Sequence, residues 1–323
     1  MIEVPKLINK PFRASSYILD EDLKNAVELA LALNQPLLLT GEPGTGKTKL
    51  AEFVAHELSG TAGSTFLPEP LVFNTKTSSR ATDLFYSYDA LGHFQASNIK
   101  NLDEGNLKTT ADFIELQALG KAIAHTNPSQ FGPSAKWFNN RISAQPKSSV
   151  VLIDEIDKAP RDFTNDILHE IEKLRFEIKE LENTAVESAQ GQRILIIMTS
   201  NSEKNLPDAF LRRCLFYHIA FPNADKLNKI LKSQIREDGP LANNEEAINH
   251  MINAFNDLRD KSPRKKPATA EFVAWARILD NMNFVASSYT EAEQKIQQYM
   301  SVLVKTREDR EELMKRSSDR IRI

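Results

Sequence analysis

A glycine-rich segment carries the most specific chemistry in this sequence. Residues 41–48 follow the apolar run 36–40 and precede a stretch with apolar residues four apart. Glycines let a loop turn its backbone N–H groups toward a phosphate, because a Cβ would obstruct the close approach. A helix that begins at the loop adds its positive end. This order of strand, loop and helix predicts a phosphate-binding loop made of Gly41, Glu42, Pro43, Gly44, Thr45, Gly46, Lys47 and Thr48.

Two side chains at the end of this loop have predicted roles. The Lys47 ammonium can reach the β and γ phosphates of a nucleotide as a point charge. The Thr48 hydroxyl can join the ligand shell of Mg²⁺, an ion that usually keeps waters and phosphates as its other ligands. The alternative is a glycine turn with an exposed lysine, which the flanking strand and helix disfavour.

A second candidate site is the acidic end of the apolar run 149–153. A continuous apolar strand is typical of a parallel sheet buried on both faces, and ligands bind at the carboxyl ends of such strands. Asp154 follows the run and is predicted to hold magnesium, and Glu155 is predicted to polarise an attacking water. The alternative is an acidic strand cap that faces solvent.

Three more polar residues end predicted elements. Asn201 closes the apolar strand 193–201, where its amide could orient the water, although a lone asparagine is more often a turn residue. Arg212 and Arg213 end the short helical segment 206–214. Cations stabilise a helix C-terminus in their own right. The functional alternative is a guanidinium that neutralises a transferring phosphoryl group, supplied to a neighbouring subunit.

Composition sets the class of protein. With 323 residues, 41% hydrophobic and 26% charged, the chain is long enough for about two domains with a real core. No run of eighteen apolar residues and no charged-then-apolar leader is found, so a cytoplasmic protein without a membrane segment is expected. Cys214 is the only cysteine, which excludes an intramolecular disulfide. The net charge of −3 argues against a general nucleic-acid surface but leaves a local basic pore open.

The remaining elements indicate a change near residue 222 from a mixture of strands and helices to helices alone. Before it, residues 89–147 form a long irregular stretch with one helix-like piece at 113–124, expected to be a lid or contact element or else a tolerated insertion. The alternation at 176–181 predicts a hairpin that leads into the next strand. After residue 222, amphipathic helices follow one another, and one of them is predicted to begin with a capping box at Thr290.

The basic run 261–267 lies between two of these helices. It is either a solvated loop or the source of a cation for the nucleotide, with Lys266 as the candidate. The charged tail from Arg307 is expected to be an exposed or frayed helix.

Together these motifs resemble the AAA+ ATPases, and in detail their MoxR branch. The resemblance rests on the stretches 36–48, 82–90, 117–122, 154–160 and 206–214 and covers the chain from about Tyr17 to Leu279. It implies an α/β fold of the P-loop NTPase (AAA+) class, with a parallel sheet of order 5-1-4-3-2 and a smaller all-helical lid domain. The implied domains are 1–221, with an inserted segment at about 89–147 and a presensor hairpin at about 176–193, and 222–323.

The resemblance also implies roles for the candidate residues. Lys47 and Thr48 form the Walker A pair, Asp154 and Glu155 the Walker B pair, and Asn201 is sensor 1. Arg213 is the expected arginine finger, with Arg212 as the alternative. The chain departs from the family pattern at the lid, where an arginine usually opens a helix as sensor 2, and Lys266 is the substitute candidate.

The implied function is Mg²⁺-dependent ATP hydrolysis by a homo-oligomeric ring, expected to be a hexamer, that remodels a partner protein in the manner of a chaperone. MoxR-like proteins are similar to chaperones that act with von Willebrand factor A domain partners. Two alternatives remain open, a nucleotide-gated binding switch with slow turnover and a nucleic-acid motor subunit similar to McrB.

Overall fold

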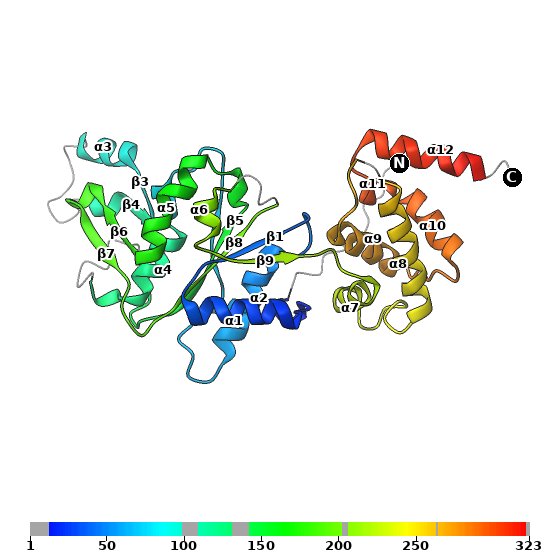
Figure 1. Cartoon of the computed structure of the whole chain (residues 1–323), viewed down its shortest axis with the longest axis horizontal. Helices are drawn as coiled ribbons and strands as arrows, with labels where there is room; N and C mark the ends of the chain where they lie inside the picture. Colours follow the sequence, from blue (N-terminus) through cyan, green and yellow to red (C-terminus); the bar gives the residue numbers. More distant parts are fainter. Residues whose placement is uncertain (1–12, 99–108, 131–141, 202–205, 263, 321–323) are drawn as a thin grey trace. The chain divides into compact units, whose positions relative to one another are not determined.

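Two compact units make up the chain in a computed structural model (Figure 1). It describes residues 13–98, 109–130, 142–201, 206–262 and 264–320. The sheet-containing unit consists of Leu19–Gly41 and Lys47–His218. The helical unit consists of Glu42–Gly46, Ile219 onward and the described residues before Leu19. The domain limits implied by the family resemblance stay a prediction.

A five-stranded parallel sheet forms the centre of the first unit. Its order is β2-β5-β8-β1-β9, with bounds β1 Leu37–Gly41, β2 Leu71–Asn74, β5 Ser149–Asp154, β8 Ile194–Thr199 and β9 Leu215–Ile219. Counted along the chain within this sheet alone, these strands read 5-1-4-3-2 from the β9 edge, the expected order. The strand labels reach β9 because the four strands of two separate hairpins, β3-β4 and β6-β7, are numbered between the strands of this sheet.

The central strands are buried on both faces. Each residue of β1 and β8 is buried, as is every residue of β5 except the last. Helices cover them, with bounds α1 Glu21–Leu33, α2 Lys47–Gly60, α4 Ala118–Thr126 and α5 Arg161–Lys173. The register pairs Leu152 with Ile197, so that β5 and β8 end side by side. This alignment brings the polar residues after each strand to one edge of the sheet.

The segment 113–124 is not the single helix that the sequence predicts. It contains the end of the short helix η4 (Thr110–Phe113), the strand β4 (Ile114–Leu116) and the first part of α4. Ile114 and Leu116 are buried on either side of exposed Glu115, and β4 pairs antiparallel with β3 (Tyr86–Tyr88). This alternation of period two is too short to separate from a helical pattern by inspection. Every residue of α4 except Lys121 is buried, so this part of the irregular stretch belongs to the core.

A second hairpin lies beside the first one. It consists of β6 (Arg175–Ile178) and β7 (Thr184–Glu187), paired antiparallel, and it precedes β8 as the alternation indicates. The Phe176 ring stacks on Phe85 at 5.1 Å between centroids, and the Tyr86 hydroxyl accepts a hydrogen bond from the Lys179 N–H at 3.2 Å. The remaining short elements of this unit are η2 Ala81–Leu84, α3 Ala90–Asn98, η6 Ile156–Lys158, η7 Lys179–Leu181 and α6 Asp208–Leu211.

Gly120 of α4 packs directly against backbone. A Cβ built on it would overlap the carbonyl oxygen of Phe85, which also accepts a hydrogen bond from the Gln117 N–H at 2.8 Å. We expect Gly120→Ala to lower the free energy of unfolding by about 1–3 kcal/mol, because the carbonyl has little room to move. Urea unfolding followed by circular dichroism measures this change.

Gly60, the last residue of α2, is the matched control. Nothing lies within 4 Å of a Cβ built there. Since alanine has the higher helix propensity, Gly60→Ala is expected to be neutral or stabilising by up to about 1 kcal/mol. Equal effects at the two glycines would contradict the packing argument.

The second unit is built from helices around an aromatic core. Phe255, Phe272 and Trp275 are fully buried, with 4.6 Å between the Phe255 and Phe272 ring centroids. The elements are η1 Ala14–Ser16, α7 Ala224–Gln234, α8 Glu245–Asp260, α9 Thr269–Asn281, α10 Tyr289–Gln298, α11 Met300–Leu303 and α12 Arg307–Arg320.

One prediction for this unit is wrong, and another holds with one exception. The cap of α10 is Ser288, whose hydroxyl accepts from the Glu291 N–H, so the predicted capping box at Thr290 is wrong by two residues. Both sites have serine or threonine three residues before glutamate, so the pattern alone could not separate them. The tail does form a helix, but its Asp309 is fully buried and accepts from the N–H groups of Arg264 and Lys265. The charged tail therefore fixes the backbone of the basic run.

Candidate nucleotide site

The phosphate-binding loop has the backbone that its glycines require. Gly44 and Gly46 have φ angles of 79° and 91°, in the region that residues with a Cβ rarely adopt. A Cβ on Gly44 would lie 3.0 Å from the Cβ of Ala268, and one on Gly46 would lie 3.3 Å from the Tyr17 ring. The loop therefore needs glycine both for its turns and for its close contacts.

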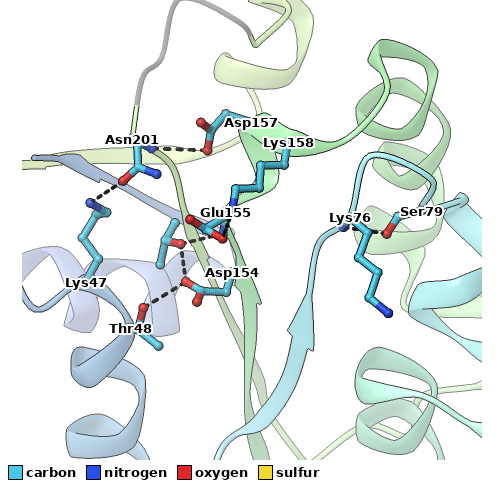
Figure 2. A network of polar contacts seen from close by, with 10 residues as sticks. Lys47, Thr48, Lys76, Ser79, Asp154, Glu155, Asp157, Lys158 and Asn201 are labelled. Atoms are coloured by element: carbon cyan, nitrogen blue, oxygen red, sulfur yellow. Dashed lines mark hydrogen bonds and ion pairs between the residues drawn. The ribbon is translucent and has the colours of Figure 1, made fainter. Parts of the chain in front are cut away.

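Lys47 begins α2 and lies almost wholly buried. Its ammonium donates hydrogen bonds to the Gly41 carbonyl at 2.8 Å and to Asn201 Oδ1 at 3.1 Å (Figure 2). Both of these acceptors are neutral oxygen atoms. The structure thus brings together two residues that the sequence assigned to the same site from positions 154 apart.

The acidic pair contacts the loop through Thr48, and a buried threonine of β8 links its two members. Asp154 Oδ1 accepts hydrogen bonds from Thr48 Oγ1 at 3.0 Å and from Thr199 Oγ1 at 2.5 Å. The Thr199 hydroxyl in turn accepts from the Glu155 N–H at 2.8 Å. Thr199 was not singled out from sequence, since it lies inside an apolar strand pattern. It fixes Asp154 and Glu155 relative to the strand beside them.

The oxygen atoms of Thr48 and Asp154 fit a magnesium ion. Mg²⁺ is held by one or two protein oxygens together with phosphates and waters. Among the described residues, no group of three or more histidine, cysteine, aspartate or glutamate side chains is placed to hold a metal. This donor set therefore suits magnesium bound with a nucleotide better than a metal held by protein alone.

The one-turn helix η6 carries two contacts that the sequence did not predict. The Asp157 carboxylate accepts from the Asn201 N–H at 3.3 Å, and the Lys158 ammonium forms an ion pair with Glu155 (Figure 2). This hydrogen bond from Lys158 to Glu155 raises the pKa of the Lys158 ammonium. The only indication of these contacts in the sequence was that Asp157 and Lys158 follow closely after Asp154 and Glu155.

The two arginines lie at the opposite end of β1 from the loop. Both line a cavity of about 200 Å³ together with Pro36, which precedes β1. The side chain of Arg213 is 52% exposed and lies 4.0 Å from Glu172. Five residues of strand span about 16 Å. Neither arginine is therefore placed beside the phosphate loop at the other end of its own strand.

Cys214 lies against the same cavity. Its burial raises the pKa of the thiol to about 12, so the thiol stays protonated at neutral pH.

Lys266 is an exposed residue of the segment between α8 and α9. In the same unit, the nearly buried Arg259 forms a 3.0 Å ion pair with Glu42 of the loop. The Arg259 guanidinium also lies 3.4 Å from the centre of the Phe221 ring. The contact with the loop therefore comes from a residue that the sequence analysis did not select, while the role of Lys266 stays a prediction.

Loss of the Lys47 ammonium should remove a charged contact from the phosphates. We expect Lys47→Ala to weaken ATP binding about 10- to 100-fold, since a hydrogen bond to a charged group contributes about 1.5–3 kcal/mol. Isothermal titration calorimetry with ATP and Mg²⁺ measures this. Lys49→Ala is the control, because Lys49 on the same helix pairs with Glu52 at 2.6 Å. Equal binding by wild type and Lys47→Ala would contradict the site.

A comparison with protein families identifies the family of this chain. Residues 37–223, more than half of the chain, match the family model described as "ATPase family associated with various cellular activities (AAA)". None of the curated proteins matches the sequence.

Mutant forms of RuvB from Thermotoga maritima are among the solved structures that match this chain. One mutant form has a TM-score of 0.46 and 14% identity over 90% of this chain and 73% of that chain. Another has a TM-score of 0.43 and 14% identity over 86% of this chain and 67% of that chain.

Among the helices that the structure describes, none is long and apolar enough to cross a membrane.

Proposed function

The chain belongs to the AAA family of ATPases, and on that premise we propose that it is an ATP-hydrolysing ring ATPase of the MoxR type that remodels a partner protein. The observation that carries the ATPase part is the hydrogen-bonded chain from Thr48 through Asp154 and Thr199 to Glu155. It joins the phosphate loop to the predicted base through contacts of 3.0 Å or less.

This arrangement supports the following proposed roles of the side chains in hydrolysis. Lys47 would bind the β and γ phosphates, and Thr48 and Asp154 would hold magnesium, which would neutralise phosphate charge when bound. Glu155 accepts the proton of the attacking water, and Asn201 orients that water. Phosphoryl transfer asks a protein mainly for positioning and charge neutralisation, which these fixed polar groups supply.

The position of the arginines supports the proposed assembly into a ring. Arg213 and Arg212 lie beyond the far end of β1 and are exposed to solvent. A guanidinium there can serve a phosphoryl group only if that group belongs to a neighbouring copy of the chain. Hydrolysis therefore depends on a homo-oligomer, which we propose to be a hexameric ring in the cytoplasm.

The ATPase rate per subunit, measured against protein concentration with the mass determined in parallel, tests this proposal. We expect the rate to rise at the concentrations where rings form. A rate that is independent of concentration in a monomeric protein would exclude the shared site. Removing Mg²⁺ with EDTA should abolish turnover at every concentration.

The partner is proposed to be a protein, and a von Willebrand factor A domain protein is the first choice. Turnover that rises when the partner is added supports remodelling. Unchanged slow turnover combined with ATP-dependent partner binding would support a nucleotide-gated switch instead. Salt-sensitive stimulation by DNA would point to a nucleic-acid motor.

A further inference from the structure

The residue proposed as catalytic base has a fixed backbone. Glu155 has a φ angle of 56°, which few residues other than glycine adopt. Its N–H donates to Thr199, and the next residue, Ile156, is fully buried. The backbone of Glu155 is therefore held on both sides, while its side chain keeps three rotatable bonds.

The side chain has its own restraint. The Lys158 ammonium, three residues along in η6, donates a hydrogen bond to Glu155 Oε2. In the part of the chain that the structure describes, no partner is found for the other carboxylate oxygen. Figure 2 shows the Lys158 side chain running back to Glu155 from the turn that follows β5. One oxygen is thus engaged and the other is left for a water.

We propose that Lys158 is a positioning residue that holds the Glu155 carboxylate in the orientation used for water activation. This inference rests on the proposed ATPase function. The same turn also holds the other residue assigned to the water, because Asp157 accepts from the Asn201 N–H. η6 thereby connects the predicted base and sensor 1 through adjacent side chains.

A purely structural role predicts a different result. The side chains of Lys158 and Glu155 are 50% and 41% exposed, and ion pairs of this kind contribute little to stability. Loss of Lys158 should therefore leave the unfolding midpoint unchanged. Its effect should fall on turnover, since only catalysis requires one orientation of the carboxylate.

The test compares Lys158→Ala and Lys158→Arg with wild type under conditions where rings form. We expect Lys158→Ala to lower kcat about tenfold while KM and the Kd for ATP stay within about twofold, and Lys158→Arg to recover most of the rate. Lys24→Ala is the matched control, because Lys24 forms an exposed ion pair with Glu21 at the same spacing. It should keep the wild-type rate.

A double-mutant cycle with Glu155→Gln separates this inference from the proposed function. Because Lys158 acts through the carboxylate, Lys158→Ala should cause little further loss in the Glu155→Gln background. An unchanged or raised kcat in Lys158→Ala, or an equal loss in both backgrounds, would overturn the positioning role. A wild type that does not hydrolyse ATP, or a fully active Glu155→Gln, would overturn the ATPase site itself.

Discussion

Replacing Arg213 with alanine is expected to lower the assembly-dependent ATPase rate by about 10³-fold or more, with ATP binding nearly unchanged. An arginine finger supplied in trans contributes about 10³ to 10⁵ in rate, because it neutralises charge that develops on the transferring phosphoryl group. Its guanidinium lies at the opposite end of β1 from the loop, so its removal leaves the chain's own binding site intact. ATPase rates and calorimetric ATP titrations of assembled protein measure the two effects.

Arg212→Ala is the matched control for this prediction. The two arginines are neighbours in sequence, and both are exposed at the end of α6. If only Arg212→Ala removes the assembly-dependent rate, the finger is Arg212. Wild-type rates in both variants would exclude a finger at this position.

The shared site can also be tested by mixing variants. A subunit with Arg213→Ala keeps its own Glu155, and a subunit with Glu155→Gln keeps its own arginine. Mixed rings should therefore recover part of the activity that either variant lacks alone. No recovery in rings shown to contain both subunits would contradict an arginine that acts on the neighbour.

Replacing Glu155 with glutamine is expected to lower kcat by about 10² to 10⁴, the usual contribution of a general base. Glutamine has nearly the same shape but cannot accept the proton of the attacking water. The N–H of residue 155 should still donate to Thr199, so Asp154 and the loop should keep their arrangement. The variant should therefore bind ATP with Mg²⁺ as wild type does and retain it without hydrolysis.

Binding and single-turnover measurements separate these two properties. Glu21→Gln is a suitable control, because Glu21 lies on α1 and forms only an exposed ion pair with Lys24 among its described contacts. It should bind and hydrolyse ATP at the wild-type rate. Normal turnover in Glu155→Gln would remove Glu155 from the mechanism.

Local sequence was sufficient where the chemistry lies in one contiguous segment. The loop needs glycines with positive φ angles followed by lysine and threonine, and all of these are neighbours in the chain. Asp154 and Glu155 were predicted for the same reason, because a buried strand places the residues at its end at a known edge of the sheet. The strands β1, β5 and β8 could be located from their apolar runs.

Short and interrupted patterns were not sufficient. Three residues of β4 could not be distinguished from the helix that follows, because the pairing of β4 with β3 is a contact with a strand 26 or more residues earlier.

The sequence by itself therefore determined the fold class, the phosphate loop and the acidic pair, since each depends on neighbours in the chain. Only the tertiary structure decided that Thr199 joins Asp154 to Glu155 and that Asn201 meets Lys47. It also placed both arginines beyond the far end of β1. These contacts join residues from different strands and helices. The register of the packed sheet sets the distances between those residues, and no local pattern in the sequence contains that register.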